Sequence, residues 1–421
     1  MRKKRRKENT NTNIDIPHDL NLVEQDSIFR KIVIWGVLPI WLILLVLALS
    51  PFTGDPAAPI KNVIISTLGF IVSLSLVGMG WLQGRKIKLK KTLTIVLVGY
   101  LGILLISTLF AYNKGLAISE VILWFTLCVI AFYIHLLVKN EKEIEWILLW
   151  VVIAIGLSSV YGFLQKYGID PFPWSTRNVE EYRGLPSSYA NPNFAGHALI
   201  FAVITSLALA LYYFSVVWRK SDEISEENKA SQKWIWVKLA VTIVAFILTS
   251  SHLYLTRMRS ARIALLVALA FALFYLLVGK KWHPRKIVGF ALGLSLVGVV
   301  LIVIMFYILS SVGSDKPLPF DNSLNLRLNG YYGAVKMILE RPVFGFGPGN
   351  YRFANIPYWT NYEKLWFTLE KKRNYHVHCD PLEVLIDGGI LAGVFYFAMI
   401  LLALSGEYIY TEIPKISSPD M

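Results

Sequence analysis

The sequence lacks several devices that enzymes acting on nucleotide-activated substrates often use. No Asp-x-Asp motif occurs, so the usual means of holding a divalent cation on a nucleotide-sugar is missing. The glycine-rich segment 345–349 has no following Lys and Ser/Thr, so we interpret it as a tight turn rather than a phosphate-binding loop. There are only two cysteines, Cys128 and Cys379, which exclude a disulfide framework.

Charge is also scarce, while apolar residues are abundant. Only 17% of the 421 residues are charged and 55% are hydrophobic, with a mean hydropathy of +0.52. Apolar runs near the roughly 18 residues that cross a bilayer as a helix predict an all-α, polytopic membrane protein of about ten spans. These runs cover residues 32–50, 62–82, 92–111, 116–138, 144–165, 193–218, 234–251, 263–279, 287–311 and 384–404.

Lysine and arginine are placed as expected for cytoplasmic loops. The first seven residues contain six of them, and a cytoplasmic amino terminus also puts the other basic loops inside. The net charge of +14 therefore indicates topology and lipid attraction, not a nucleic-acid partner. We expect a basic cytoplasmic tail (1–30), nine spans with short loops (31–311), a large external loop with short helices (312–380), a last span (381–405) and a cytoplasmic tail (406–421).

His378 is the leading candidate for a catalytic residue. The motif Asp380-Pro381-Leu382-Glu383 predicts a helix start, with Asp380 as N-cap and Glu383 as its reciprocal partner. His378 would precede this helix at the outer edge of the membrane. The positive end of a helix disfavours imidazolium, so we expect a neutral histidine that can act as a general base. A loop histidine bonded to the backbone is the structural alternative.

Three further residues are secondary candidates: His376, Glu383 and Asp387. His376 is a competing base. The His-x-His pair could bind a metal, but no suitably spaced partner completes a site, so we predict no metal and no cofactor. Glu383 and Asp387 lie four residues apart on one helix face, where they could orient a histidine, bind sugar hydroxyls, or only complement the helix dipole.

Four arginines fall on the predicted external side: Arg183, Arg259, Arg262 and Arg327. Guanidinium is permanently charged and can grip a phosphate with two hydrogen bonds. Several of them together would suit a lipid diphosphate. Alternatively they pair with acidic side chains or extend to lipid headgroups.

The order of these segments resembles the bacterial O-antigen ligase and O-antigen polymerase superfamily. The segments that carry the resemblance are 161–171, Arg183 through Asn191-Pro192-Asn193, 262–266, 327–342, 345–350 and 378–389. The chain departs from the family pattern at Cys379, where Asn is common, and at Pro381, where an aromatic is common. It also has fewer expected spans than the dozen often found.

The resemblance implies an inner-membrane glycosyltransferase with a large periplasmic loop. Such enzymes move a glycan from undecaprenyl diphosphate to an acceptor hydroxyl, with inversion and without metal. It assigns His378 as the essential histidine and Arg262 and Arg327 as diphosphate contacts, with Arg183 a weaker match. The acceptor could be lipid A core, a growing polysaccharide or a protein, which would make the chain a ligase, a polymerase or an oligosaccharyltransferase. A transporter or flippase of lipid-linked sugars is the alternative of another class.

Overall fold

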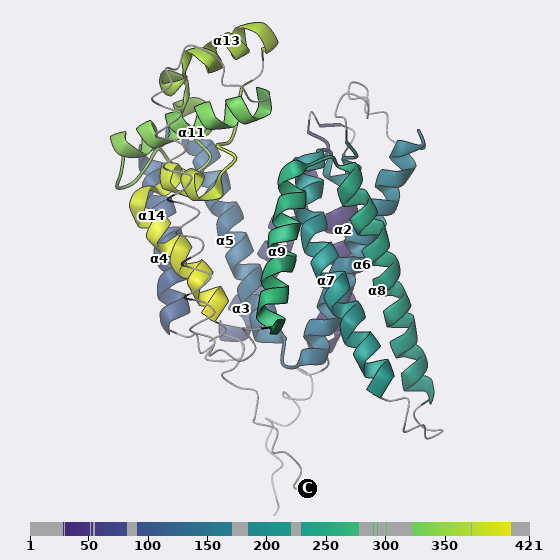
Figure 1. The fold of residues 1–421 in the computed structure, drawn as a ribbon. Helices are drawn as coiled ribbons and strands as arrows, with labels where there is room; N and C mark the ends of the chain where they lie inside the picture. Colours follow the sequence, from purple (N-terminus) through teal and green to yellow (C-terminus); the bar gives the residue numbers. More distant parts are fainter. Residues whose placement is uncertain are drawn as a thin grey trace, which may run out of the picture. The chain divides into compact units, whose positions relative to one another are not determined.

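A computed structural model describes residues 30–50, 52–53, 55–81, 91–170, 184–219, 229–277, 322–371 and 373–405, with isolated positions 28, 289, 293 and 300. Within this part of the chain all regular structure is helical (Figure 1). Eight helical segments in it are long and apolar enough to cross a membrane. They cover Arg30–Leu47, Ala58–Leu76, Lys91–Phe110, Lys114–His135, Glu141–Lys166, Pro192–Trp218, Gln232–Leu255 and Asp380–Leu402.

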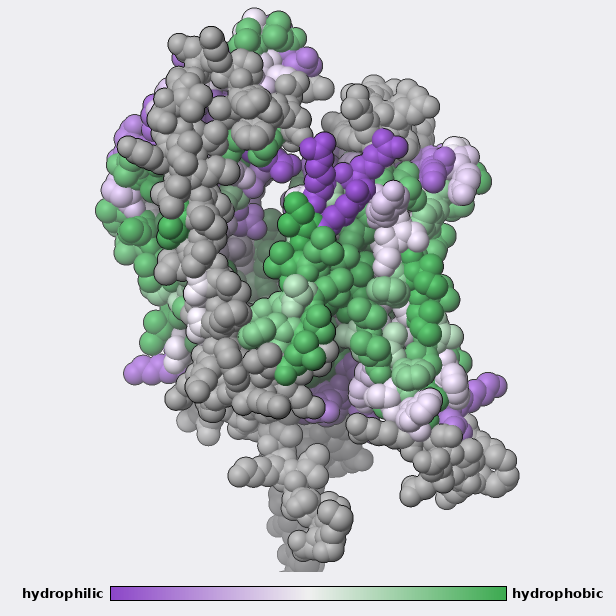
Figure 2. All heavy atoms as spheres, in the orientation of Figure 1, coloured by the Kyte–Doolittle hydropathy of each residue, from purple (hydrophilic) through white to green (hydrophobic). Residues whose placement is uncertain are grey.

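These eight segments match the predicted first to seventh and tenth spans, and they confirm an all-α polytopic membrane protein. Helix α9 (Arg259–Leu277) occupies the eighth predicted position. The ninth, at 287–311, lies outside the described residues except at isolated positions. Apolar side chains cover the lengths of the helices and polar ones gather mostly towards their ends (Figure 2). Large exposed side chains such as Leu266 and Val267 are what lipid contact requires.

The described helices form two compact units. The first combines residues 1–48 and 137–258. It contains a π-helical turn (Val33–Val37), α2 (Leu38–Leu47), α6 (Glu141–Lys166), α7 (Pro192–Arg219) and α8 (Lys229–Leu255). Helix α6 packs against α2, α7 and α8, and α7 packs against α8. Helix α7 starts at Pro192, as predicted, and Asn191 Oδ1 accepts from Asn193 N at 2.8 Å.

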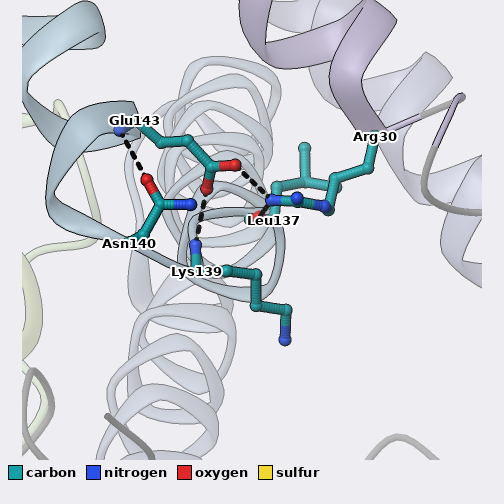
Figure 3. A network of polar contacts seen from close by, with 5 residues as sticks. All are labelled: Arg30, Leu137, Lys139, Asn140 and Glu143. Atoms are coloured by element: carbon teal, nitrogen blue, oxygen red, sulfur yellow. Dashed lines mark hydrogen bonds and ion pairs between the residues drawn. The ribbon is translucent and has the colours of Figure 1, made fainter. Parts of the chain in front are cut away.

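A polar network at the start of α6 ties the first span to this unit (Figure 3). Asn140 caps the helix by accepting from Glu143 N at 3.1 Å. The Glu143 side chain is buried, and its two oxygens accept from Arg30 at 2.6 Å and from Lys139 N at 2.7 Å. Arg30 also donates to Leu137 O at 2.9 Å. A buried carboxylate is tolerated here because each oxygen has a donor.

The second compact unit combines residues 49–136 with 259–421. Its further helices are α3 (Ala58–Trp81), α4 (Lys91–Ser107), α5 (Lys114–Leu137), α11 (Asn322–Glu340), α12 (Tyr351–Ala354), α13 (Asn361–Glu370) and α14 (Asp380–Ser405). Helix α14 packs against α4, α11 and α12, and α11 packs against α13. The described residues of the predicted external loop thus contain one long and two short α-helices and a 3-10 turn (Ile356–Tyr358).

The backbone of the glycine-rich turn after α11 is hydrogen-bonded to α14. Gly345, Gly347 and Gly349 all have φ between +64° and +88°, a region open mainly to glycine. Phe346 N donates to Ile386 O at 2.7 Å and Gly347 N to Asp387 O at 3.0 Å. Two carbonyls inside α14 therefore accept hydrogen bonds from outside the helix. The tight turn predicted from the sequence is present, and its partner is the last span.

Candidate active site

The segment that carries His376 and His378 is anchored by the buried residue between them, Val377. Val377 is 1% exposed and packs in a hydrophobic cluster drawn from α11, α12 and α14. The other buried members of this cluster are Ala334, Met337, Phe346, Tyr351, Ala354 and Ile386. His376 and His378 flank this buried residue. Both histidines are exposed.

His376 is paired with a carboxylate. Its Nδ1 lies 2.6 Å from Glu383 Oε1, and its side chain is 51% exposed. This hydrogen bond is the largest influence on its pKa and raises it above the ordinary value. Glu383 is therefore not the reciprocal capping partner predicted at the helix start; its side chain is used by His376 instead. Helix α14 also begins at Asp380, one residue before the predicted Pro381.

The surroundings of His378 shift its pKa in the opposite direction. Loss of surrounding water lowers its pKa, and the positive charge of Arg327 lowers it further, followed by His376. The backbone of His378 is left-handed, with φ of +62°, which is uncommon for a residue other than glycine. Tyr331 Oη donates to the His378 carbonyl oxygen at 3.2 Å and fixes this conformation. The lowered pKa keeps the imidazole neutral and able to accept a proton at neutral pH.

Arg327 and Tyr331 come from one face of α11, because they are four residues apart on a helix. Arg327 acts on the pKa values of both His378 and Tyr331, so its guanidinium lies near both groups. The pKa of Tyr331 is raised by burial, so its phenol stays protonated as a hydrogen-bond donor. A cation and a neutral base therefore face the same region.

Asp387 anchors the glycine-rich turn. Its Oδ1 accepts from Gly349 N at 3.1 Å, and its backbone oxygen accepts from Gly347 N and from the Ser107 hydroxyl. These contacts position the turn, a role that was not among those considered for Asp387 from the sequence.

Two charged residues join this group although sequence reasoning did not single them out. Arg352, on α12, and Glu120, on α5, both act electrostatically on His376. A Cβ added at Gly349 would lie 2.7 Å from Glu120 Cγ. A glycine at this position therefore leaves room for the Glu120 side chain. The available signal for Glu120 was a lone acidic residue inside the apolar run 116–138, a feature that usually marks function.

The other three predicted arginines lie on other segments of the chain. Arg259 and Arg262 lie in the first turn of α9, and their approach to His378 stays a prediction. Arg183 lies outside the described residues. Over the described residues, no group of three His, Cys, Asp or Glu side chains is arranged to hold a metal ion.

Comparison with known proteins matches residues 244–397 to the O-antigen ligase family. The match covers a little over a third of the chain, and this region is what is similar to the family. This confirms the resemblance read from the sequence, and the matched region contains α9, α11, both histidines and most of α14. Neither the curated proteins nor the solved structures gave a match. The match supports a membrane protein of the O-antigen ligase and polymerase type.

Proposed function

We propose that the protein transfers a glycan from undecaprenyl diphosphate to an acceptor hydroxyl on the non-cytoplasmic side of the inner membrane, with inversion and without metal. The observation that carries the proposal is that Tyr331 of α11 donates to the His378 carbonyl oxygen, while Arg327, one turn earlier on the same helix, lowers the pKa of His378. A neutral base and a fixed cation are the two groups that such a transfer needs.

The proposed reaction is a single displacement at the anomeric carbon. His378 accepts the proton of the acceptor hydroxyl while that oxygen forms its bond to the anomeric carbon. The bond from this carbon to the diphosphate oxygen breaks on the opposite face, and its electron pair leaves with the lipid diphosphate. Arg327 stabilises the departing negative charge, and Arg262, with Arg259 and Arg183, is proposed to share this task.

The test is transfer by purified full-length protein in lipid nanodiscs. The donor is undecaprenyl-diphosphate glycan from the source cell, offered with lipid A core, with a second lipid-linked glycan or with a serine-containing protein. A covalent product in a chelator-treated reaction supports the proposal, and the productive acceptor separates ligase, polymerase and oligosaccharyltransferase. Movement of lipid-linked glycan across vesicles without any covalent product would instead support the transporter alternative.

The pH dependence of transfer is expected to change when Arg327 is replaced by Gln. Transfer requires neutral His378, so the rate rises with pH through the pKa of this residue and then levels off. Arg327 lowers that pKa, so its removal raises the pKa and moves the acidic limb of kcat/KM to higher pH. Lys336→Gln is the control, because Lys336 is an exposed cation on the same helix. An unmoved acidic limb in Arg327→Gln would contradict the electrostatic role, whatever happens to KM.

A further inference from the structure

The end of helix α11 leaves four apolar residues exposed. Val335 is 37% exposed, Leu339 74% and Val343 47%, and Pro342 is also exposed. Spaced at i, i+4, i+7 and i+8, they continue one face of the helix into the turn that follows it. We call these four residues the α11 patch. Single exposed apolar side chains are ordinary, but several together on one face indicate a contact surface.

Contacts of the same turn fix the level of the patch relative to the membrane-length helices of its unit. Arg341 Nη1 donates to Phe110 O at 3.2 Å, and the Phe110 and Phe344 rings stack with their centres 5.5 Å apart. Phe110 is the last residue of the membrane-length segment that contains α4. On the other side, Ile390 N of α14 donates to Pro342 O at 2.7 Å. The patch therefore lies at the level where α4 ends and where α14 is kinked.

The neighbouring faces of these two spans are lipid-facing. Leu109, next to Phe110, is 69% exposed, and Ile390 and Val394 on α14 are 58% and 62% exposed. Because they belong to membrane-length helices, these apolar side chains meet lipid and not water. Helix α11 runs crosswise to α4 and α5 (Figure 1), which is the orientation of a helix that lies along a bilayer surface. The patch thus extends a lipid-facing surface that the spans already provide.

Cationic and aromatic side chains border the patch. The ammonium of Lys336, an exposed residue, lies 4.3 Å from the centre of the Tyr332 ring. The Arg341 guanidinium lies 4.5 Å from the ring centre of Phe346 and 5.7 Å from that of Tyr112. Aromatic rings and long cationic side chains are enriched at the depth of lipid headgroups, where the cations reach phosphate. Lysine is depleted in protein–protein interfaces, so this border favours a lipid surface over a protein partner.

We propose that the α11 patch docks in the phospholipid surface of the leaflet at which α4 ends, so that α11 is an interfacial helix. Leu339 and Val343 enter the boundary between headgroups and acyl chains, and Lys336 lies at the phosphates. Arg327 and Tyr331 lie on the same helix, so seating its end holds them near headgroup depth, where the diphosphate of a lipid-linked donor lies. This last consequence rests on the proposed function, whereas the lipid contact itself does not.

The test is the accessibility of a spin label in full-length protein in nanodiscs of phosphatidylethanolamine and phosphatidylglycerol. The label is attached in turn to Leu339→Cys, Leu369→Cys and Val394→Cys, in a background that carries Cys128→Ser and Cys379→Ser. Leu369 is the matched control, because it is also a leucine and is 69% exposed. It lies on α13, on the far side of α11 from α4 and α14 (Figure 1). Val394 reports lipid contact from within α14.

Two reagents that relax the label report its surroundings, because oxygen concentrates in lipid and a nickel chelate stays in water. We expect oxygen to relax the label at Leu339→Cys more strongly than the chelate does, as at Val394→Cys. At Leu369→Cys the chelate should be the stronger of the two. Val335→Cys is a second position on the patch, and oxygen should be stronger there too. A stronger chelate effect at the two patch positions, as at Leu369→Cys, would overturn the proposal, because the patch would then face water.

A second copy of the chain seated on the patch would give a different result. Both reagents would then be excluded from the label at Leu339→Cys, and the labels of two copies would broaden each other's spectrum. This outcome also overturns the lipid contact. The measurement needs no glycan transfer, so the two failures are distinguishable. Absent transfer with oxygen stronger at Leu339→Cys contradicts only the proposed function, and transfer with the chelate stronger there contradicts only the docking of α11.

Discussion

A His378→Ala variant is expected to transfer glycan about a hundredfold more slowly than wild type, or worse, which is the usual effect of losing a positioned general base. The loss should appear in kcat and persist at saturating donor, because the imidazole acts on the acceptor proton and does not anchor the lipid. The measurement is initial rate in nanodiscs with the productive acceptor. His378 is exposed, so the variant should elute and melt like wild type.

His376→Ala is the matched control, because it removes the same side chain two residues away. His376 is held by Glu383 at 2.6 Å and its pKa is raised, so more of it is protonated and unable to accept a proton. We expect a smaller loss than for His378→Ala. The reverse ranking, with His376→Ala the slower variant, would move the role of base to the His376 and Glu383 pair.

The helices could be predicted from the sequence because a bilayer demands long apolar segments. Seven of the first eight predicted spans and the last one coincide with membrane-length helices, and helix α9 occupies the remaining position. The start of α7 at Pro192 was also predictable, because an N-cap residue and a proline at the first helical position are local signals. The predicted span at 287–311 lies outside the described residues.

The candidate site could be predicted only in part. Arg327, His376 and Glu383 were candidates from the sequence, since ionisable side chains near a membrane are costly unless they function, whereas Arg352 and Glu120 were not. Which of these groups pair could not be predicted. Glu383 matched a capping box, and only the fold shows that its carboxylate pairs with His376. Glu120 contacts the site through tertiary packing of α5 against Gly349, which no local pattern encodes.

Gly389→Ala is expected to lower the stability of the second compact unit by at least about 3 kcal/mol, because it combines a strained backbone with a direct clash. Gly389 has φ of +69° and ψ of −167° inside α14, a region that essentially only glycine adopts. An added Cβ would lie 2.1 Å from Val343 O and 2.3 Å from Val343 C. Both atoms belong to the backbone, so they cannot move aside as a flexible side chain would.

The matched control is Gly102→Ala on α4, the helix that packs against α14. A Cβ at Gly102 meets nothing within 4 Å, so alanine there should be neutral or stabilise the helix by roughly 0.5–1 kcal/mol. Thermal unfolding in detergent, followed by loss of monodisperse protein, compares the two. Gly389→Ala should also lose transfer, because Ile390 N donates to Pro342 O at 2.7 Å and this contact seats the glycine-rich turn beside the histidines. If Gly389→Ala and Gly102→Ala unfold at the same temperature, the kink in α14 is not required for stability.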